Sequence, residues 1–299
     1  VVFAVHTMPH RSFFSDDAFI SLRYSQRLIE SEGLTWNDGE RVEGYTNLLF
    51  VLANAGLGAL GLSLLDSARL IGALSVLAMA AAILRLHPPR GISSVLPATG
   101  GVLILVLSGP IVVWAMGGLE QPLLTALLIW AMVYALPLLQ EESPRIRHAL
   151  PAGALLALVT LTRADGAVLV IGVVAGLLLA RGFRLKAVRQ AAGLVMLPIA
   201  AQLAQLAFRY VYYGAFAPNT ARAKVAFTST RILTGMQYVL ETWPIFVPIA
   251  AAVVGLIALG VWRADACRRR LTMLAGVICV WVVYVAIIGG DYHAAHRHM

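Results

Sequence analysis

Apolar runs long enough to cross a lipid bilayer recur along this chain, and they limit its fold more than any other feature. A transmembrane helix needs about 18–20 predominantly apolar residues. The chain has such runs near residues 67–84, 92–113, 119–139, 190–213, 243–262 and 271–288, and a further stretch, 149–180, that is divided by the polar sequence TRADG. Hydrophobic residues make up 60% of the sequence. The sequence therefore predicts an all-α, polytopic helical membrane protein and argues against a soluble domain.

Basic residues are concentrated in short loops between these runs. The loops 85–91, 140–148, 181–189 and 263–270 hold 12 of the 23 lysines and arginines but only three carboxylates. Because cytoplasmic loops of membrane proteins carry an excess of lysine and arginine, we expect all four loops to be cytoplasmic. The net charge of +8 is then a topology signal, and we expect no nucleic-acid partner.

Carboxylates gather in one polar stretch near the start of the chain. Seven of the 15 lie between Asp16 and Glu43. Charged groups are costly in a membrane protein and mark functional sites, so the adjacent Asp16 and Asp17 are the first candidates for catalysis. The alternative is that Ser15 caps a helix and the aspartates only interact favourably with its dipole. We expect this helix to be amphipathic, with its apolar face on the membrane surface.

Residues 45–65 decide the topology. The segment is long enough to cross the bilayer, but Asn47, Asn54 and several glycines make it a weak span. If it crosses, the aspartates lie on the same side as the basic loops. If it dips into the membrane and returns, the aspartates and the later polar clusters share the opposite, outer face. We expect the second arrangement.

About eight full spans follow from that choice. We expect one transmembrane domain over 1–299, with the remnant of a helix at its start and without the C-terminal part of a longer protein. The first extracytoplasmic loop is 9–66, including the dipping segment, and the second is 213–242. The predicted spans are 67–84, 92–113, 119–139, 149–162, 165–180, 190–213, 243–262 and 271–288.

Further polar residues are expected beside the aspartates at the outer face. Glu43 precedes the dipping segment, where partial desolvation raises the pKa of a carboxyl group. Cations at a membrane boundary suit a lipid-linked phosphate, although Arg163 can instead pair with Asp165, and Glu120 can simply face a helix dipole. The candidate substrate-binding residues are Arg23, Glu120, Arg163, Tyr213, Asn219, Arg222, Lys224, Asp291 and Arg297.

A resemblance to a known family rests on six motifs in a fixed order: DDAFISLRY, NDGERVEGYTN, GLEQPL, LTRADG, YYGAFAPNTARAK and GGDYHAAHR. Each motif alone is weak, but their order is more specific. Together they resemble polytopic GT-C glycosyltransferases, and most of all the cell-wall arabinofuranosyltransferases of actinobacteria. The resemblance runs through essentially the whole chain.

The resemblance implies a sugar donor on a polyprenyl phosphate and a glycan or lipid acceptor, used at the outer face of the bacterial plasma membrane. The essential aspartate of the family's first outer loop matches Asp16, with Asp17 beside it. A glutamate that is important in related aminoarabinose transferases lies at a place similar to Glu43. In this interpretation Asp16 accepts a proton from the acceptor hydroxyl, and Asp17 and Glu43 orient the acceptor or bind a divalent cation.

The competing interpretation is a membrane transporter or lipid flippase. A transporter would place ionisable residues or broken helices near the bilayer midplane. The apolar runs of this chain carry few charges, and its polar groups collect between the runs. This distribution favours the glycosyltransferase.

Cysteine accessibility labelling tests the expected path of residues 45–65. If the segment dips and returns, single cysteines introduced at Arg41 and Ser63 will react with an impermeant reagent from the same side of the membrane. A cysteine at Arg85, in a basic loop, is the control and should react only from the other side. Labelling of Arg41 and Ser63 from opposite sides would show that the segment crosses.

Overall fold

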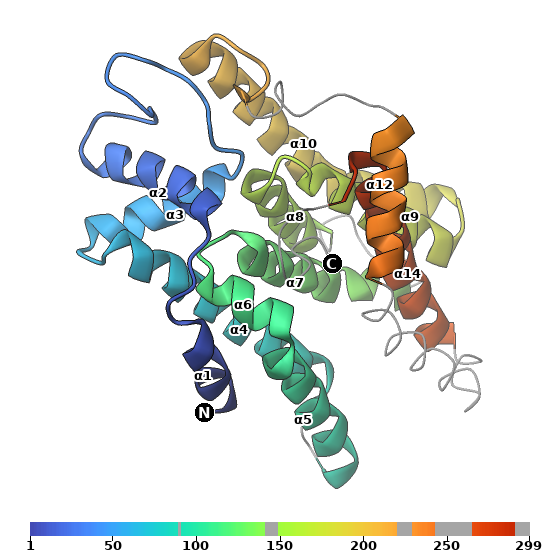
Figure 1. The fold of residues 1–299 in the computed structure, drawn as a ribbon. Helices are drawn as coiled ribbons and strands as arrows, with labels where there is room; N and C mark the ends of the chain where they lie inside the picture. The colour runs from blue at the N-terminus through green and yellow to red at the C-terminus, as the bar shows by residue number, and fades with distance from the viewer. Residues whose placement is uncertain (89–90, 141–148, 220–228, 243–264, 291–299) are drawn as a thin grey trace.

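Every regular element in the described part of the chain is a helix (Figure 1). The computed structural model describes residues 1–88, 91–140, 149–219, 229–242 and 265–290. The predicted all-α class is confirmed for these residues. The elements are α1 (Val2–Thr7), the 3-10 helix η1 (Met8–His10), α2 (Asp16–Ile29), α3 (Leu48–Ala59), α4 (Leu64–Leu86), α5 (Ile92–Leu107), α6 (Gly109–Met116), α7 (Gln121–Gln140), α8 (Leu150–Thr162), α9 (Gly166–Arg181), α10 (Leu185–Tyr213), α12 (Ser229–Glu241) and α14 (Asp265–Ile288).

Four of these helices, α4, α7, α10 and α14, are long and apolar enough to cross a membrane. The pair α5 and α6, bent by 55° at the break between them, makes a fifth if it is counted as one span. By contrast, α8 and α9 have 13 and 16 residues, about 20 and 24 Å at 1.5 Å per residue, against a hydrocarbon core of roughly 30 Å. The run 243–262 lies outside the described residues, so the count of about eight spans stays a prediction.

The segment 45–65 folds around one short helix. α3 has 12 residues and is therefore about 18 Å long, too short to cross the hydrocarbon core by itself. The chain turns at Gly61, whose φ of +98° favours glycine, and α4 then starts with Ser63 accepting a hydrogen bond from the Asp66 amide at 3.1 Å. The length of α3 agrees with a segment that dips into the membrane and returns. The side of the membrane on which residues 45–65 lie stays a prediction.

The helix that carries the aspartates packs against other helices. Ser15 occupies the N-cap position of α2, as expected, but its hydroxyl makes no capping hydrogen bond. Ala18 and Leu22 on the apolar face are only 0% and 5% exposed, because Phe14 and Trp114 cover Ala18 and residues of α3 and α4 cover Leu22. The expectation that this face lies on the membrane surface is therefore wrong for Ala18 and Leu22, whereas Ile29 on the same face is 39% exposed.

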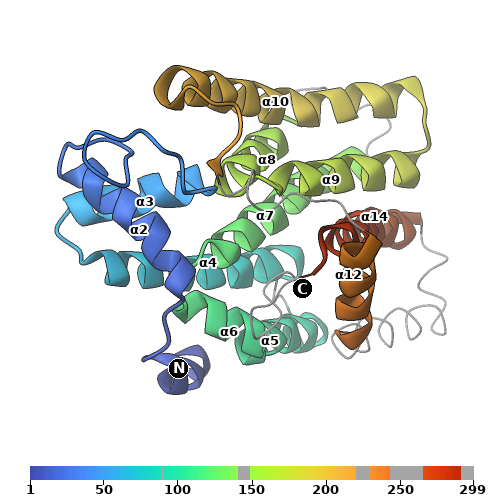
Figure 2. The ribbon, with the colours of Figure 1, turned by 45° about the horizontal axis from the view of Figure 1, so that its top comes forward.

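The two ends of the helix bundle differ in charge. Arg181 of α9 and Arg269 of α14 both donate hydrogen bonds to the carbonyl oxygen of Leu139, near the end of α7, at 3.4 and 2.9 Å. We call this the basic end. α7 begins beside α2, so its 20 residues separate the aspartate pair from the basic end by about 30 Å. Figure 2 shows α2 and α3 side by side near the late end of α10.

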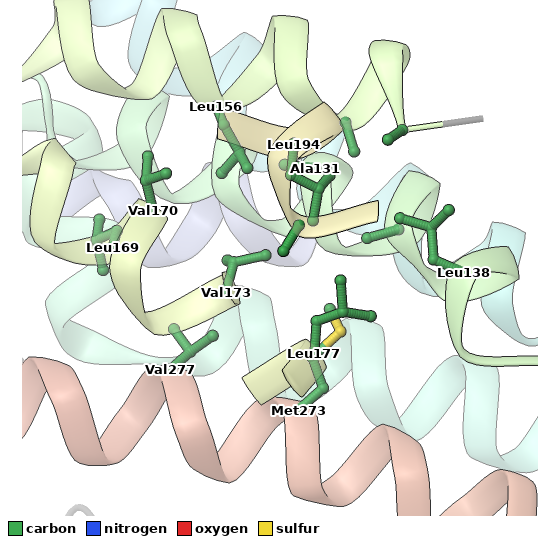
Figure 3. Close-up of a cluster of buried hydrophobic side chains, with 14 of the residues drawn as sticks. Ala131, Leu138, Leu156, Leu169, Val170, Val173, Leu177, Leu194, Met273 and Val277 are labelled. Atoms are coloured by element: carbon green, nitrogen blue, oxygen red, sulfur yellow. The ribbon is translucent and has the colours of Figure 1, made fainter. Parts of the chain in front are cut away.

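The largest apolar core lies among α7, α8, α9, α10 and α14 (Figure 3). Leu156, Val173, Leu177 and Leu194 meet there without exposed surface. The outward sides of these helices also carry apolar residues, with Ile171 of α9 at 59% and Leu203 of α10 at 61% exposure. Helices that are apolar on both their packed and their exposed sides are typical of membrane spans.

Glycines allow α9 and α14 to approach closely. Gly172 and Gly176 lie four residues apart on α9 and face Gly276 of α14. A Cβ atom on Gly176 would lie 2.4 Å from the backbone oxygen of Met273. Small residues at this spacing let the backbones of membrane helices come into contact.

Gly176→Ala should therefore destabilise the bundle. The added methyl group meets backbone atoms and forces the two helices apart, at a cost of about 1–3 kcal/mol in unfolding free energy. The matched control is Gly100→Ala in α5, where no atom lies within 4 Å of the added Cβ and helix propensity favours alanine by up to about 1 kcal/mol. Equilibrium unfolding in detergent measures the unfolding free energies of the two variants. Equal values for Gly176→Ala and Gly100→Ala would contradict the close packing of α9 and α14.

Candidate active site

The start of α2 is attached to the connection between α6 and α7. The Ser15 amide donates a hydrogen bond to the carbonyl oxygen of Gly117 at 2.9 Å. The ring of Phe14 lies against Gly118, where a Cβ atom would be 2.2 Å from the ring and where φ is +77°. Only glycine fits this position without strain. These contacts fix the first turn of α2, and with it the aspartate pair.

The two aspartates of that turn have different surroundings. Asp16 is exposed, and its Oδ1 accepts a hydrogen bond from the Asp17 amide at 2.9 Å. Asp17 is half-buried, and the buried Ser21 follows it by four residues on the same helix face. Asp17 thus lies on the side of α2 that faces the bundle, whereas Asp16 is open to solvent.

Three ionised side chains meet where α7, α8 and α9 begin or end. Arg163 directly follows α8, and its Nη1 contacts Oε1 of Glu120 at 2.8 Å, just before α7. Its Nε and Nη2 donate to the two carboxylate oxygens of Asp165, just before α9, at 2.7 and 2.8 Å. The three side chains are 15%, 8% and 10% exposed, so the charges are largely removed from water and depend on one another.

Neutral side chains extend this cluster to three further helices. Nδ2 of Asn47, the residue before α3, donates to Oε2 of Glu120 at 2.8 Å and to Oγ of Ser21 in α2 at 2.9 Å. The hydroxyl of Tyr284 in α14 donates to Oδ2 of Asp165 at 3.2 Å. Because the cluster holds two carboxylates and one guanidinium, these donors stabilise the extra negative charge. We call the six residues the polar network: Ser21, Asn47, Glu120, Arg163, Asp165 and Tyr284.

The polar network contains two of the expected binding residues, Glu120 and Arg163. The sequence allowed Arg163 either to bind a phosphate or to pair with Asp165, and the structure contains the pair with Asp165. All three guanidinium nitrogens of Arg163 face carboxylates, so a phosphate would have to compete with Glu120 and Asp165. A phosphate contact of Arg163 stays a prediction.

Glu43 is buried, at 4% exposure, and its partner comes from α10. Its Oε1 accepts a hydrogen bond from Nε of Arg209 at 2.8 Å, and Arg209 is itself 6% exposed. Burial raises the pKa of the Glu43 carboxyl, and the contact with Arg209 opposes this rise only in part. The expected direction of the shift is confirmed, but the carboxylate is paired within the protein.

Two more expected residues contact the loop that contains Glu43. The Tyr213 hydroxyl donates to the carbonyl oxygen of Leu34 at 2.8 Å and lies 3.2 Å from the Tyr45 hydroxyl. The Asn219 amide donates to the Glu43 carbonyl oxygen at 3.0 Å. Both residues thus lie beside Glu43, and the structure gives them a role in holding this loop.

The remaining expected residues are less informative. Arg23 is half-buried and makes no hydrogen bond or ion pair with another described residue. Within the described ranges no three His, Cys, Asp or Glu side chains come together as metal ligands, so a cation at Asp16 and Asp17 would take further ligands from elsewhere. Four predicted residues lie outside the described part of the chain: Arg222, Lys224, Asp291 and Arg297.

The sequence interpretation missed four residues of these contacts, Ser21, Asn47, Arg209 and Tyr284. Asn47 was read only as a weakness in a span. Arg209 lies inside an apolar helix of 29 residues, and an ionisable residue in such a helix is itself a signal of function. Tyr284 resembles an ordinary tyrosine near the end of a membrane helix, and no local pattern identifies it.

The sequence is similar to that of an enzyme. It is 33% identical over 288 residues to the terminal β-(1→2)-arabinofuranosyltransferase of Mycobacterium tuberculosis (strain ATCC 25618 / H37Rv). The match covers 90% of this chain and 43% of that relative, so the chain spans less than half the relative's length. The resemblance to cell-wall arabinofuranosyltransferases is confirmed. No family model matches the chain, and no solved structure matches it.

Replacing Arg163 with methionine should destabilise the fold strongly. The change leaves Glu120 and Asp165 buried without their cation, at a cost of about 3–5 kcal/mol in unfolding free energy. Arg268→Met is the control, because Arg268 pairs with Asp265 at the surface, where the side chains are 49% and 65% exposed, and should cost no more than about 1 kcal/mol. Similar losses in both variants, measured by equilibrium unfolding in detergent, would contradict a structural role for the network.

Proposed function

We propose, from its similarity to a terminal arabinofuranosyltransferase, that this chain is part of a membrane glycosyltransferase. The enzyme moves a sugar from a polyprenyl-phosphate donor to a glycan or lipid acceptor of the cell envelope. It works at the outer face of a bacterial plasma membrane. The observation that carries the proposal is an exposed aspartate in the first turn of a helix that is fixed to the bundle.

The charge at the two ends of the bundle supports an outer site. Arg181 and Arg269 lie at the basic end, and basic loops remain in the cytoplasm. Asp16 and Asp17 lie about one length of α7 away, roughly 30 Å, which is the thickness of the hydrocarbon core. A donor whose isoprenoid tail stays among lipids would present its phosphate and sugar at that level.

The proposed reaction is a single displacement at the anomeric carbon of the donor sugar. The acceptor hydroxyl oxygen forms a bond to this carbon, and the bond from the carbon to the phosphate oxygen breaks. The bonding electrons leave with the polyprenyl phosphate, and Asp16 accepts the hydroxyl proton as general base. Asp16 is the first choice because it is exposed; Asp17 orients the acceptor or binds a divalent cation.

Cationic side chains would stabilise the phosphate that leaves. Its negative charge develops outside bulk water, where fixed positive groups have their largest effect on a transition state. We assign this role to Arg222, Lys224 and Arg297, because all three follow predicted spans at the expected outer face. Arg163 is a weaker candidate, since two carboxylates already contact it.

Asparagine substitutions test the assignment in the full-length protein. With polyprenyl-phosphate arabinofuranose as donor, Asp16→Asn should lower turnover roughly 10²–10⁴-fold, because the amide cannot accept the proton. The matched control, Asp66→Asn, changes an exposed carboxylate in the first turn of α4 and should leave turnover unchanged.

The asparagine series separates three outcomes. If only Asp17→Asn abolishes transfer, the general base is Asp17 and not Asp16. If both single variants turn over normally, the aspartates only support the helix dipole and the proposed reaction fails. The folding of each variant is checked by comparing its size-exclusion elution in detergent with that of the parent protein, so that a folding defect is not mistaken for a loss of catalysis.

A further inference from the structure

The loop between α2 and α3, residues 30–47, is held on one side by the end of α10. The amide of Leu34 donates to the Tyr212 hydroxyl at 3.1 Å, and its carbonyl oxygen accepts from the Tyr213 hydroxyl at 2.8 Å. The guanidinium of Arg41 lies over the Tyr212 ring, 4.7 Å from its centre. Figure 2 shows this loop beside the late end of α10.

The other side of the loop is held by α2. The Tyr24 hydroxyl donates to the carbonyl oxygen of Val42 at 2.6 Å and accepts from the Gly44 amide at 2.8 Å. The Tyr24 ring packs edge-on against Tyr45, with centres 4.8 Å apart. Loop 30–47 therefore connects the aspartate helix to α10 through hydrogen bonds on both sides.

Glu43 and Arg209 form the charged contact at the centre of this connection. Both side chains are more than nine-tenths buried. Within the described residues, Oε2 of Glu43 and Nη2 of Arg209 have no hydrogen-bond partner, so each charge depends mainly on the other. Loss of either partner leaves a buried ion without compensation, which destabilises the packing around it.

We propose that Arg209 is a positioning residue for the transfer reaction. Through Glu43 it fixes loop 30–47 between α2 and α10, and so sets the place of the aspartate helix relative to the end of α10. The proposal rests on the proposed function. It gives Glu43 a role inside the protein, in place of direct contact with an acceptor or a cation.

Among the described residues, four groups face the Glu43 carboxylate: Tyr24 from α2, Tyr45 from the loop, and Arg209 and Tyr213 from α10. Of these four, only Arg209 is cationic, and it lowers the pKa of Glu43, which burial raises. In Arg209→Gln, Glu43 will keep its proton to higher pH, and a neutral acid tolerates burial. Disorder of the loop in this variant should therefore increase as the pH rises through the pKa of Glu43.

Spin-label distances test the positioning without any assay of transfer. Labels at the exposed Asn37 and Phe216, with Cys267 and Cys279 replaced by serine, report the distance between the loop and the segment after α10. At a pH above the pKa of Glu43, the distribution should be narrow in the parent, broad in Arg209→Gln, and narrow again in Glu43→Gln/Arg209→Gln, where no unpaired charge remains. Arg85→Gln, at an exposed arginine far along α4, should leave the distribution unchanged.

Transfer kinetics in the full-length protein complete the test. A displacement of about 1 Å in a catalytic group can cost on the order of 10²-fold in rate, so Arg209→Gln should lower kcat by that order with little change in KM. The double variant should regain much of the lost kcat. Arg209→Lys keeps the charge but loses the planar donor group, and should fall between the parent and Arg209→Gln.

The outcomes distinguish this inference from the proposed function. An unchanged distance distribution in both Arg209→Gln and Arg209→Lys overturns the positioning role. A broadened distribution with normal kcat overturns its link to transfer. If the parent protein transfers no sugar, the proposed function fails, while the spin-label result still decides whether Arg209 holds the loop.

Discussion

The contact of Arg163 with Glu120 and Asp165 is the interaction on which the arrangement of the helix ends depends. Removing charged groups from water costs several kcal/mol per ion unless they are paired and hydrogen-bonded. One guanidinium between two carboxylates supplies this pairing where α7, α8 and α9 meet, and Asn47 and Tyr284 extend the constraint to α3 and α14.

This constraint explains how an exposed carboxylate can be held in place. Asp16 lies on a helix whose first turn is fixed by the Ser15–Gly117 hydrogen bond and whose second turn reaches the polar network through Ser21. The later part of the helix is connected to α10 through loop 30–47. Buried charges thus determine the geometry, and under the proposed function the exposed aspartate supplies the chemistry.

Sequence reasoning was most accurate where a pattern is local. It predicted that Asp16 and Asp17 begin a helix, that Arg163 can pair with Asp165 two residues later, and that burial raises the pKa of Glu43. It was wrong about Ala18 and Leu22 on the apolar face of α2, because the sequence of one helix does not tell whether lipid or another helix covers its apolar side. It predicted that Glu43 orients an acceptor or binds a cation, and it did not predict the ion pair of Glu43 with Arg209, which lies 166 residues away.

The sequence by itself determined the all-α class and the positions of the long helices. The thickness of the bilayer fixes how many apolar residues a span needs, and an apolar run of that length can be recognised in the sequence alone. It also located the acidic segment that carries the aspartates. Only the tertiary structure decided which polar groups meet. Asn47 contacts Glu120 across 73 residues and Tyr284 contacts Asp165 across 119. Such partners are chosen by how the helices pack and by the cost of leaving a buried polar group unpaired, and neither leaves a periodic pattern in the sequence.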